Sequence, residues 1–432
     1  MADFENDEIL KYAIEHDMID MSYMQQQIEM NKRQELLEKH PYSIWEGKDG
    51  NWYTHLPDEK KGRVLRKRKT RDAIEKVVCD YWKKTEVKKE KEVLSSMTLL
   101  ELFPKWLRFK AARTNSTSYI KRITADWSRF YINNEIINKR IQSLNKIYLD
   151  TWAHTMIKEY SLTKKSYYNM SIILRQCLDY AVECGALEKN VFREVVINKK
   201  LFVRKKKPEA STQVYTTSET PKIINEMIRR YRNNPRNTAP LAVILCFEIG
   251  VRIGELVCIK MTDIHGNYIR IQRQEVRDFV YVSETKMTFN GFRVVEYTKS
   301  SDEYRDVYLT ETAKYIINFV QQVNELYGNK YDDYLFVFGK KRINHYGIQT
   351  QILRGCKHIM IPTKTAHKIR KTYISALIDA GVNIDEVRRV AGHADERTTY
   401  GNYCFNRETE EETNEKIEKA LNNNLVTKSN QF

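Results

Sequence analysis

The chain has 432 residues, which is too long for one compact core and suggests two to four domains. Hydrophobic residues make up 41% of the chain, so its composition argues against wholesale disorder. The net charge of +16 favours a polyanionic partner, either a nucleic acid or an acidic membrane surface. No apolar run approaches the roughly 18 residues of a membrane-spanning helix, and the acidic N-terminus lacks signal-peptide features. We therefore expect a nucleic-acid partner and no membrane partner.

The seven cysteines are scattered along the chain, and no CxxC pair occurs. Neither a zinc knuckle nor a disulfide framework is predicted from this spacing. We interpret the thiols as buried or incidental side chains of a cytoplasmic protein.

Residues 1–40 are predicted to form a polar helical segment, whose apolar positions at helical spacing include Ile9, Ala13 and Ile14. Residues 41–90 are predicted to form three strands and one helix. Residues 42–56 alternate aromatic and polar residues around an Asp-Gly turn, and residues 63–70 form a third candidate strand. Thr70 is expected to cap a helix, and its apolar face comprises Ile74, Val77, Val78 and Tyr81. The segment KKTEVKKEKEV that follows is interpreted as a charged linker.

Residues 96–200 show a helical pattern throughout, with Trp106, Trp127 and Trp152 as core candidates. The expected surface of this domain carries basic residues, namely Lys121, Arg122, Lys164 and Lys165. A basic linker broken by Pro208 follows, so we predict a domain boundary near residues 200–212. Residues 213–432 mix helices with a β-rich stretch between residues 268 and 309.

Four short segments of the last domain carry side chains suited to chemistry. Arg252 stands in EIGVRIGELVCIK, and Lys299 falls at an expected hairpin turn in VVEYTKSSDEYRDVYLT. His367 and Arg370 in TAHKIRKTYISAL share one helix face. The segment GHADERTTYGNY contains His393 and then Tyr403.

Together these segments resemble the tyrosine recombinase family, the phage-type integrases that cut and rejoin DNA. The family's arginine segment, HxxR box, Gly-His pair and late tyrosine occur here in the same order, and its hairpin lysine falls on Lys299. The chain departs from the family at Lys371, where many members carry a second histidine, and at residues 248–249, where threonine is common. The resemblance implies a multidomain fold, mainly α with α+β parts. Its parts would be a sheet-plus-helix unit, a helical-bundle core-binding domain and a mixed α/β catalytic domain.

The chemistry of a phosphodiester explains these residue types. The forked guanidiniums of Arg252 and Arg370 suit the non-bridging oxygens, and His393 would add a further donor to them. Tyr403 would supply the nucleophile and hold the DNA as a phosphotyrosyl ester. Tyr403 fits the family's spacing after the histidine better than Tyr400, which is expected to pack in the core. The scheme requires neither a metal nor a nucleotide cofactor.

Further roles follow from the resemblance. His367 would act as the base, and Lys299 would protonate the leaving 5′ oxygen, although Lys286 also lies in the strand region. Glu255 is expected to bind and orient the arginines and not to act as a catalytic acid. Structural alternatives remain open, because Arg252 could cap a helix and His393 could mark a helix end.

The resemblance also predicts the partner surfaces. Residues 41–90 are similar to an arm-binding domain that lays its sheet in the major groove of DNA. Its contact candidates are Arg63, Arg66 and Arg68, whereas Trp45, Trp52 and Tyr53 are expected to pack the sheet onto its helix. The linker residues Arg204, Lys205 and Lys206 would follow the duplex.

A helix is expected around Ile417, Ala420 and Leu421, and in relatives such a tail docks on a neighbour in a DNA-bound tetramer. We therefore expect a homo-tetramer on double-stranded DNA, with an excisionase and a DNA-bending host factor as possible accessory partners. The function predicted is a site-specific recombinase of a mobile element. The alternatives are a type IB topoisomerase-like enzyme and a non-catalytic DNA-binding regulator with the same fold.

Overall fold

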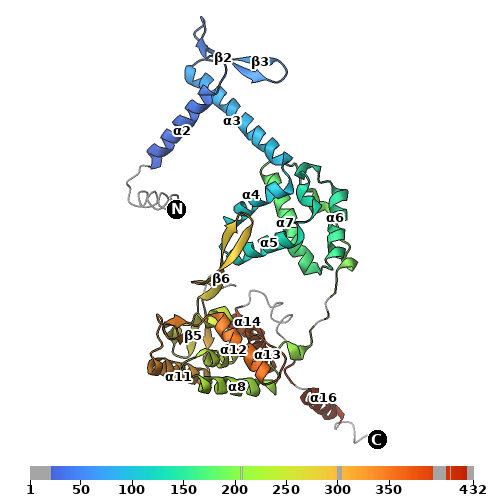
Figure 1. The fold of residues 1–432 in the computed structure, drawn as a ribbon, viewed down its shortest axis with the longest axis vertical. Coiled ribbons are helices and arrows are strands. Elements are labelled where there is room, and N and C mark those ends of the chain that lie inside the picture. Colours follow the sequence, from blue (N-terminus) through green and yellow to red (C-terminus); the bar gives the residue numbers. More distant parts are fainter. Residues whose placement is uncertain are drawn as a thin grey trace. The chain divides into compact units, whose positions relative to one another are not determined.

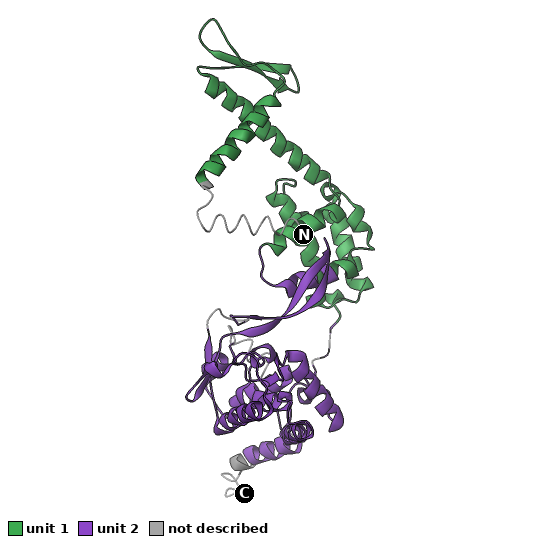
Figure 2. Ribbon diagram, turned by 60° about the vertical axis from the view of Figure 1, so that its left-hand side comes forward, with its two compact units in different colours: residues 1–112, 126–203 green, residues 113–125, 204–432 purple. Residues whose placement is uncertain are grey.

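The computed structural model of the chain describes residues 21–204, 206, 208–298, 304–392, 405–408 and 410–425. The chain divides into two compact units, which Figure 2 colours separately: residues 1–112 with 126–203, and residues 113–125 with 204–432. Helices predominate, with small antiparallel sheets (Figure 1), which confirms the fold class predicted from the sequence. Among the described helices, none is long and apolar enough to cross a membrane.

The first unit begins with the predicted combination of three strands and a helix. Its elements are α2 (Met21–Glu38), β1 (Trp45–Glu46), β2 (Trp52–Asp58), β3 (Gly62–Arg68) and α3 (Arg71–Ser96). The strands form an antiparallel sheet in the order β1-β2-β3. Thr70 caps α3 by accepting a hydrogen bond from the Ala73 N–H at 3.2 Å. Ile74 and Val78 of α3 are fully buried beneath the sheet.

The register of this sheet corrects one expectation about its aromatic residues. Thr54 and Leu56 in β2 are buried at 0% and 6% exposure, so their face packs towards α3. Tyr53 points to the opposite face, because successive strand residues alternate. Trp45 pairs with Tyr53 across the strands, and the two rings stack with centroids 5.9 Å apart. Trp52 alone of the three aromatic residues shares the buried face, so the expected packing of Trp45 and Tyr53 onto α3 is wrong.

The predicted charged linker at residues 83–93 is also wrong in its conformation, because α3 continues as a helix to Ser96. The segment contains no glycine or proline, and lysine and glutamate are good helix formers. Lys88 and Glu92 lie one turn apart and form an ion pair at 3.9 Å. High charge alone therefore does not interrupt this helix.

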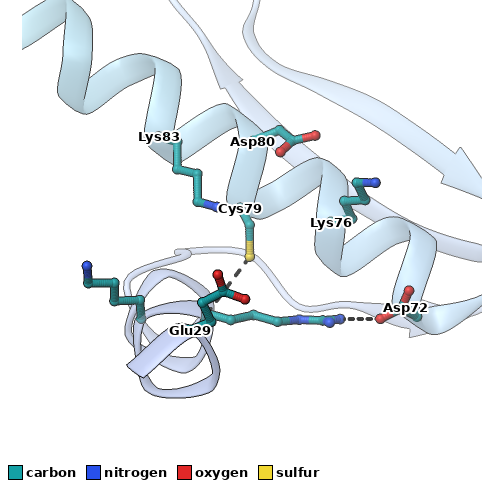
Figure 3. Close-up of a pocket in the computed structure, with 8 residues that line it drawn as sticks. Glu29, Asp72, Lys76, Cys79, Asp80 and Lys83 are labelled. Atoms are coloured by element: carbon teal, nitrogen blue, oxygen red, sulfur yellow. Dashed lines mark hydrogen bonds and ion pairs between the residues drawn. The ribbon is translucent and has the colours of Figure 1, made fainter. Parts of the chain in front are cut away.

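Helix α2 packs against α3 through charged side chains. The Arg33 guanidinium binds Asp72 at 2.6 Å and Glu75 at 2.8 Å. Figure 3 shows the adjoining pocket of about 360 Å³, which is lined by acidic and basic side chains of both helices and by Cys79. Residues 21–38 thus form the helix expected there, while Ile9, Ala13 and Ile14 lie outside the described residues.

A helical bundle follows, as predicted. Its helices are α4 (Leu99–Ala111), α5 (Thr117–Phe130), α6 (Lys146–Glu159) and α7 (Lys164–Glu183). Trp106 and Trp127 are 2% exposed and Trp152 is 6% exposed, so all three lie in the core as expected. Phe103 stacks on Trp127 with ring centroids 3.8 Å apart.

The second unit is organised around α9 (Ala239–Ile249), a helix that is apolar on nearly all sides and therefore buried. Helices α8, α11, α12 and α13 pack against it. The other helices are α8 (Glu219–Asn233), α10 (Ile253–Leu256), α11 (Glu311–Tyr327), α12 (His345–His358), α13 (Ala366–Asp379), α14 (Ile384–Ala391) and α16 (Glu410–Leu425). Helix α16 is the tail helix expected from the sequence.

The β-rich stretch of this unit contains separate sheets. Strands β4 (Ile264–His265), β5 (Tyr268–Ile271) and β8 (Arg305–Tyr308) form one sheet, and β6 (Gln274–Ser283) pairs with β7 (Lys286–Val295) in a long hairpin. A small pair, β9 (Val337–Phe338) and β10 (Lys341–Arg342), completes the set. The strands that flank Lys299, β7 and β8, thus belong to different sheets, so the simple hairpin expected there is wrong. The inserted β6–β7 hairpin separates β8 from its partner β5 in the sequence.

Candidate active site

The site begins where α9 ends. Gly250 terminates this helix with a φ of +61°, and a Cβ there would lie 2.0 Å from Cδ1 of Tyr373, so only glycine fits. Arg252 immediately precedes α10. The Glu255 carboxylate accepts a hydrogen bond from the Arg252 backbone N–H at 2.9 Å and another from its Nη1 at 2.8 Å. Arg252 therefore caps α10 with its backbone while its side chain, 23% exposed, projects into the site.

Glu255 also binds a second arginine. Arg305 in β8 donates from Nη1 and Nη2 to the two oxygens of Glu255, at 3.2 and 2.5 Å. The Glu255 side chain is completely buried, and burial by itself disfavours the charged form. The guanidiniums of Arg305 and Arg252 outweigh this effect and lower the pKa of Glu255 to about 2. Glu255 is therefore a buried anion that orients two cations.

Three arginines bind three successive carbonyls at the end of α14. Arg305 Nε donates to the Val390 oxygen at 2.9 Å, Arg370 Nη2 donates to Ala391, and Arg252 Nη2 donates to Gly392 at 3.1 Å. Gly392 ends the helix with a φ of +62°. Cations at a helix C-terminus satisfy its orphan carbonyls and oppose the negative end of its dipole. The contacts fix the backbone up to the residue before His393.

Helix α13 supplies His367 and Arg370. Arg370 is 1% exposed and donates from Nη1 to the Gly250 carbonyl at 3.1 Å, which joins α13 to the end of α9. His367 remains exposed to solvent at the edge of the site. Desolvation by surrounding protein and the neighbouring cations, led by Lys371, lower its pKa to about 4. Its imidazole is consequently neutral near pH 7, and it has one nitrogen that can accept a proton.

The structure brings Arg252, His367 and Arg370 into this one region. Lys299, His393 and Tyr403, together with Tyr400, lie outside the described residues. Lys286, the other lysine considered, lies at the tip of the β6–β7 hairpin, where it pairs with Ser283. A ten-residue strand such as β7 spans roughly 30 Å. Lys286 is therefore remote from the base of the hairpin, which packs on α10.

The sequence analysis assigned no role to Arg305. Its position in the strand could have indicated that it is buried. Arg305 lies two residues before the fully buried Val307, so both side chains face inward. An inward-facing arginine requires a buried partner.

Within the described ranges, no group of three or more His, Cys, Asp or Glu side chains is arranged to hold a metal ion.

The predicted DNA-contact residues fall into different environments. Lys121 donates to the Met287 carbonyl of the hairpin at 2.7 Å, and the Arg122 guanidinium lies 5.2 Å from the Tyr119 ring centroid. Lys164 and Lys165 open α7 and line a largely apolar groove of about 720 Å³ that also includes Lys199. Lys205 lies outside the described residues, and its neighbours Arg204 and Lys206 are exposed.

The three arginines predicted in β3 are exposed but do not share one face. Strand alternation places Arg63 with Lys67 on the outer face that carries Tyr53, and it places Arg66 and Arg68 on the other face. Lys67 also lies 5.6 Å from the Tyr53 ring centroid. The outer face therefore combines cations with aromatic rings.

Comparison with known proteins finds a family match over the part of the chain that carries this site. Residues 213–410 match the phage integrase family. This match confirms the resemblance stated from the sequence, and together with the curated relatives below it supports the predicted function of a site-specific recombinase.

Among curated relatives, a tyrosine recombinase XerC-like protein of Caldanaerobacter subterraneus subsp. tengcongensis is 23% identical, over 69% of this chain and 76% of its own length. The integrase of Staphylococcus phage L54a is also 23% identical, over 77% and 96%. Among solved structures, the Tn1549 transposon integrase in complex with circular intermediate DNA is 18% identical with a TM-score of 0.56, covering 75% of this chain and 100% of that one. A lambda integrase tetramer bound to a Holliday junction has a TM-score of 0.50 at 14% identity, covering 82% and 96%. At these identities, the structural similarity establishes the fold alone.

Proposed function

We propose that the chain cuts and rejoins DNA through a 3′-phosphotyrosyl intermediate on Tyr403 and that it exchanges strands through a Holliday junction. The observation that carries the proposal is the convergence of Arg252 and Arg370 on the carbonyls of Gly392 and Ala391. Arg252 lies in the turn before α10 and Arg370 lies on α13, and their guanidiniums bind the two residues that directly precede His393 in the chain. A phosphate bound at this point would face two permanent positive charges.

In this proposal Arg252 and Arg370 stabilise the negative charge that grows on the non-bridging oxygens during attack by Tyr403. The next residue after Gly392 has its Cα about 3.8 Å away, so the anchored end of α14 limits where His393 can offer its donor. His367 accepts the phenolic proton, and Lys299 protonates the 5′ oxygen that leaves. Neither metal nor ATP is needed, because the phosphotyrosyl ester retains the energy of the broken linkage.

The low pKa of His367 in the free protein is compatible with this role. The cations that lower it would be partly neutralised by the phosphate of bound DNA, so the pKa of His367 would rise towards neutrality in the complex. A base with a pKa near the working pH transfers protons most effectively. Phosphate binding would therefore activate the base at the moment it is needed.

The remaining surfaces would bind the duplex and neighbouring copies. We assign residues 41–90 to arm sites, residues 96–200 to the core site and residues 213–432 to catalysis, with residues 1–40 as an additional helical segment. Lysines at the start of α7 are unfavourable for the helix dipole, so Lys164 and Lys165 fit a phosphate partner better than a purely structural role. Exposed Ile417 and Leu421 on α16 would dock on the next subunit of a homo-tetramer. The enzyme would act in the cytoplasm, with accessory excisionase and DNA-bending proteins.

The test is a reaction with two defined sites. Purified protein and a plasmid that carries two copies of the element's joined ends should give recombinant circles without added metal or ATP. Relaxation of a plasmid that lacks the sites would favour the topoisomerase-like alternative. Binding without any strand exchange or covalent adduct would favour the non-catalytic regulator and would contradict the proposal.

A further inference from the structure

Lys371 occupies an unusual environment on α13, directly after Arg370. Its side chain is nearly buried, with 9% of the residue exposed. Its ammonium donates to the Gln213 side-chain oxygen at 3.2 Å and lies 4.5 Å from the ring centroid of Phe405. Burial lowers the pKa of Lys371, so these contacts must offset part of the cost of keeping a charge there.

The contacts join chain segments that are far apart in sequence. Gln213 lies at the end of the interdomain linker and also accepts a hydrogen bond from Lys368. Phe405 is additionally anchored on α13, where its backbone N–H donates to Ser375 Oγ at 3.2 Å. We refer to Gln213, Lys371 and Phe405 as the Lys371 clamp. The clamp holds the linker end and the chain after residue 404 on the helix that carries His367 and Arg370.

Phe405 follows Tyr403 by two residues, which span at most about 7 Å of extended chain. Any contact that fixes Phe405 therefore restricts the position of the Tyr403 backbone. We propose that Lys371 is a positioning residue that holds the nucleophile segment against α13 through the Phe405 ring and the Gln213 amide. This inference rests on the proposed function, because it requires Tyr403 to be the nucleophile.

A simpler reading treats Lys371 as one of many positive charges that attract DNA. That reading gives Phe405 no special importance, since a ring carries no net charge. It also predicts that loss of Lys371 weakens DNA binding and leaves the rate in the bound complex unchanged. If the clamp positions the nucleophile segment, loss of Lys371 should instead leave DNA binding unchanged and lower the rate in the bound complex.

The experiment measures covalent adduct formation on a nicked suicide duplex at saturating protein, together with the Kd for the same DNA. We expect Lys371→Met and Phe405→Leu each to slow adduct formation by about tenfold, the scale of one cation–π contact in a partly desolvated site, with Kd unchanged. The double variant should be no slower than either single variant, because both remove one interaction. Lys371→Arg should restore most of the rate, since a guanidinium also stacks on aromatic rings. Lys314→Met, which removes an ammonium from α11, is the matched control and should leave the rate unchanged.

A rate for Lys371→Met within twofold of the wild type, or additive effects in the double variant, would overturn the inference. A second measurement separates this failure from failure of the proposed function. Hydrogen exchange at the Phe405 amide should be faster in Lys371→Met than in the wild type, whether or not any adduct forms. If the wild type forms no adduct, the proposed function fails; unchanged exchange at Phe405 rejects the clamp itself.

Discussion

Arg305 and Glu255 form a buried ion pair that connects β8 to the start of α10. The guanidinium contacts both carboxylate oxygens, at 3.2 and 2.5 Å, and its remaining nitrogen reaches the Val390 carbonyl. The Glu255 carboxylate also accepts hydrogen bonds from the backbone N–H and the Nη1 of Arg252. The pair thus links the strand, the helix that follows Arg252 and the end of α14, and these are the elements that bring the candidate catalytic arginines together.

Removal of Arg305 should be costly, because it leaves the Glu255 charge buried with fewer partners. We expect Arg305→Met to lower the free energy of unfolding by about 3–5 kcal/mol, the usual cost of breaking one side of a buried pair. Urea denaturation measures this loss. Arg270→Met is the matched control in the neighbouring strand, because its ion pair with Asp306 is about one-third exposed on each side and should be worth under about 1 kcal/mol. Equal losses in the two variants would contradict a special role for Arg305.

Arg252→Lys should separate catalysis from folding. Lysine keeps a positive charge near Glu255 but cannot reproduce the forked contacts to Glu255 and Gly392. We expect the rate of DNA cleavage to fall by about 10²–10³-fold, the scale for one lost donor to a developing oxyanion, while DNA affinity changes little. Single-turnover cleavage measures the rate, and a binding titration measures the DNA affinity. Arg270→Lys should alter neither, and an equal drop in affinity would contradict the assignment.

His367 should make the stability of the free protein depend on pH. Its pKa is lowered from 6.5 to about 4 in the folded state, so the unfolded chain binds more protons between these values. Stability is therefore unaffected by this group above its unfolded pKa, and it declines as the pH falls through the window from 6.5 to about 4. His367→Gln should flatten that decline, although solvent access to the imidazole makes the slope shallow.

Urea unfolding of both proteins between about pH 5 and pH 8 tests this expectation. The low pKa of Glu255 does not interfere, because its contribution is lost only as the pH falls from 4.5 towards about 2. Parallel curves for wild type and His367→Gln over the chosen range would show that His367 has an ordinary pKa.

Gly250→Ala should destabilise the site by straining the backbone at the end of α9. The substitution combines a left-handed φ with a Cβ that meets Tyr373, and the Gly250 carbonyl accepts from Arg370. We expect a loss of about 3 kcal/mol or more in unfolding free energy. Gly328→Ala is the matched control, because Gly328 also ends a helix with φ +64° but has no atom within 4 Å of its Cβ position, and it should cost about 1–2 kcal/mol. Similar losses would mean that Tyr373 moves aside at no cost.

Short motifs allowed the sequence to predict much of the catalytic domain. His367 and Arg370 share one helix face by their spacing, and their resemblance to the family's HxxR box indicated that they are site residues. Arg305 was not given a role, because its importance depends on a partner fifty positions away, and nothing local to β8 identifies Glu255. The inserted hairpin between β5 and β8 likewise depends on which strands pair, and period-two patterns do not reveal pairing.

The N-terminal unit shows the same limit. Strand alternation was visible in residues 42–56, but the buried side of the sheet is decided by packing on α3, so Tyr53 was assigned to the wrong face. The lysine-rich segment after Trp82 was interpreted as a linker from its charge. Its helical propensity and the absence of glycine and proline were the better guide.

Tyr403 is the residue that we propose attacks the DNA backbone beside Arg252 and Arg370. The most direct measurement is to trap the protein on a suicide duplex, digest the covalent complex and identify the tyrosine that carries the nucleotide by mass spectrometry. We expect the adduct on Tyr403, its loss in Tyr403→Phe and its retention in Tyr400→Phe. An adduct on Tyr400, or none in a protein that binds the same DNA, would contradict it.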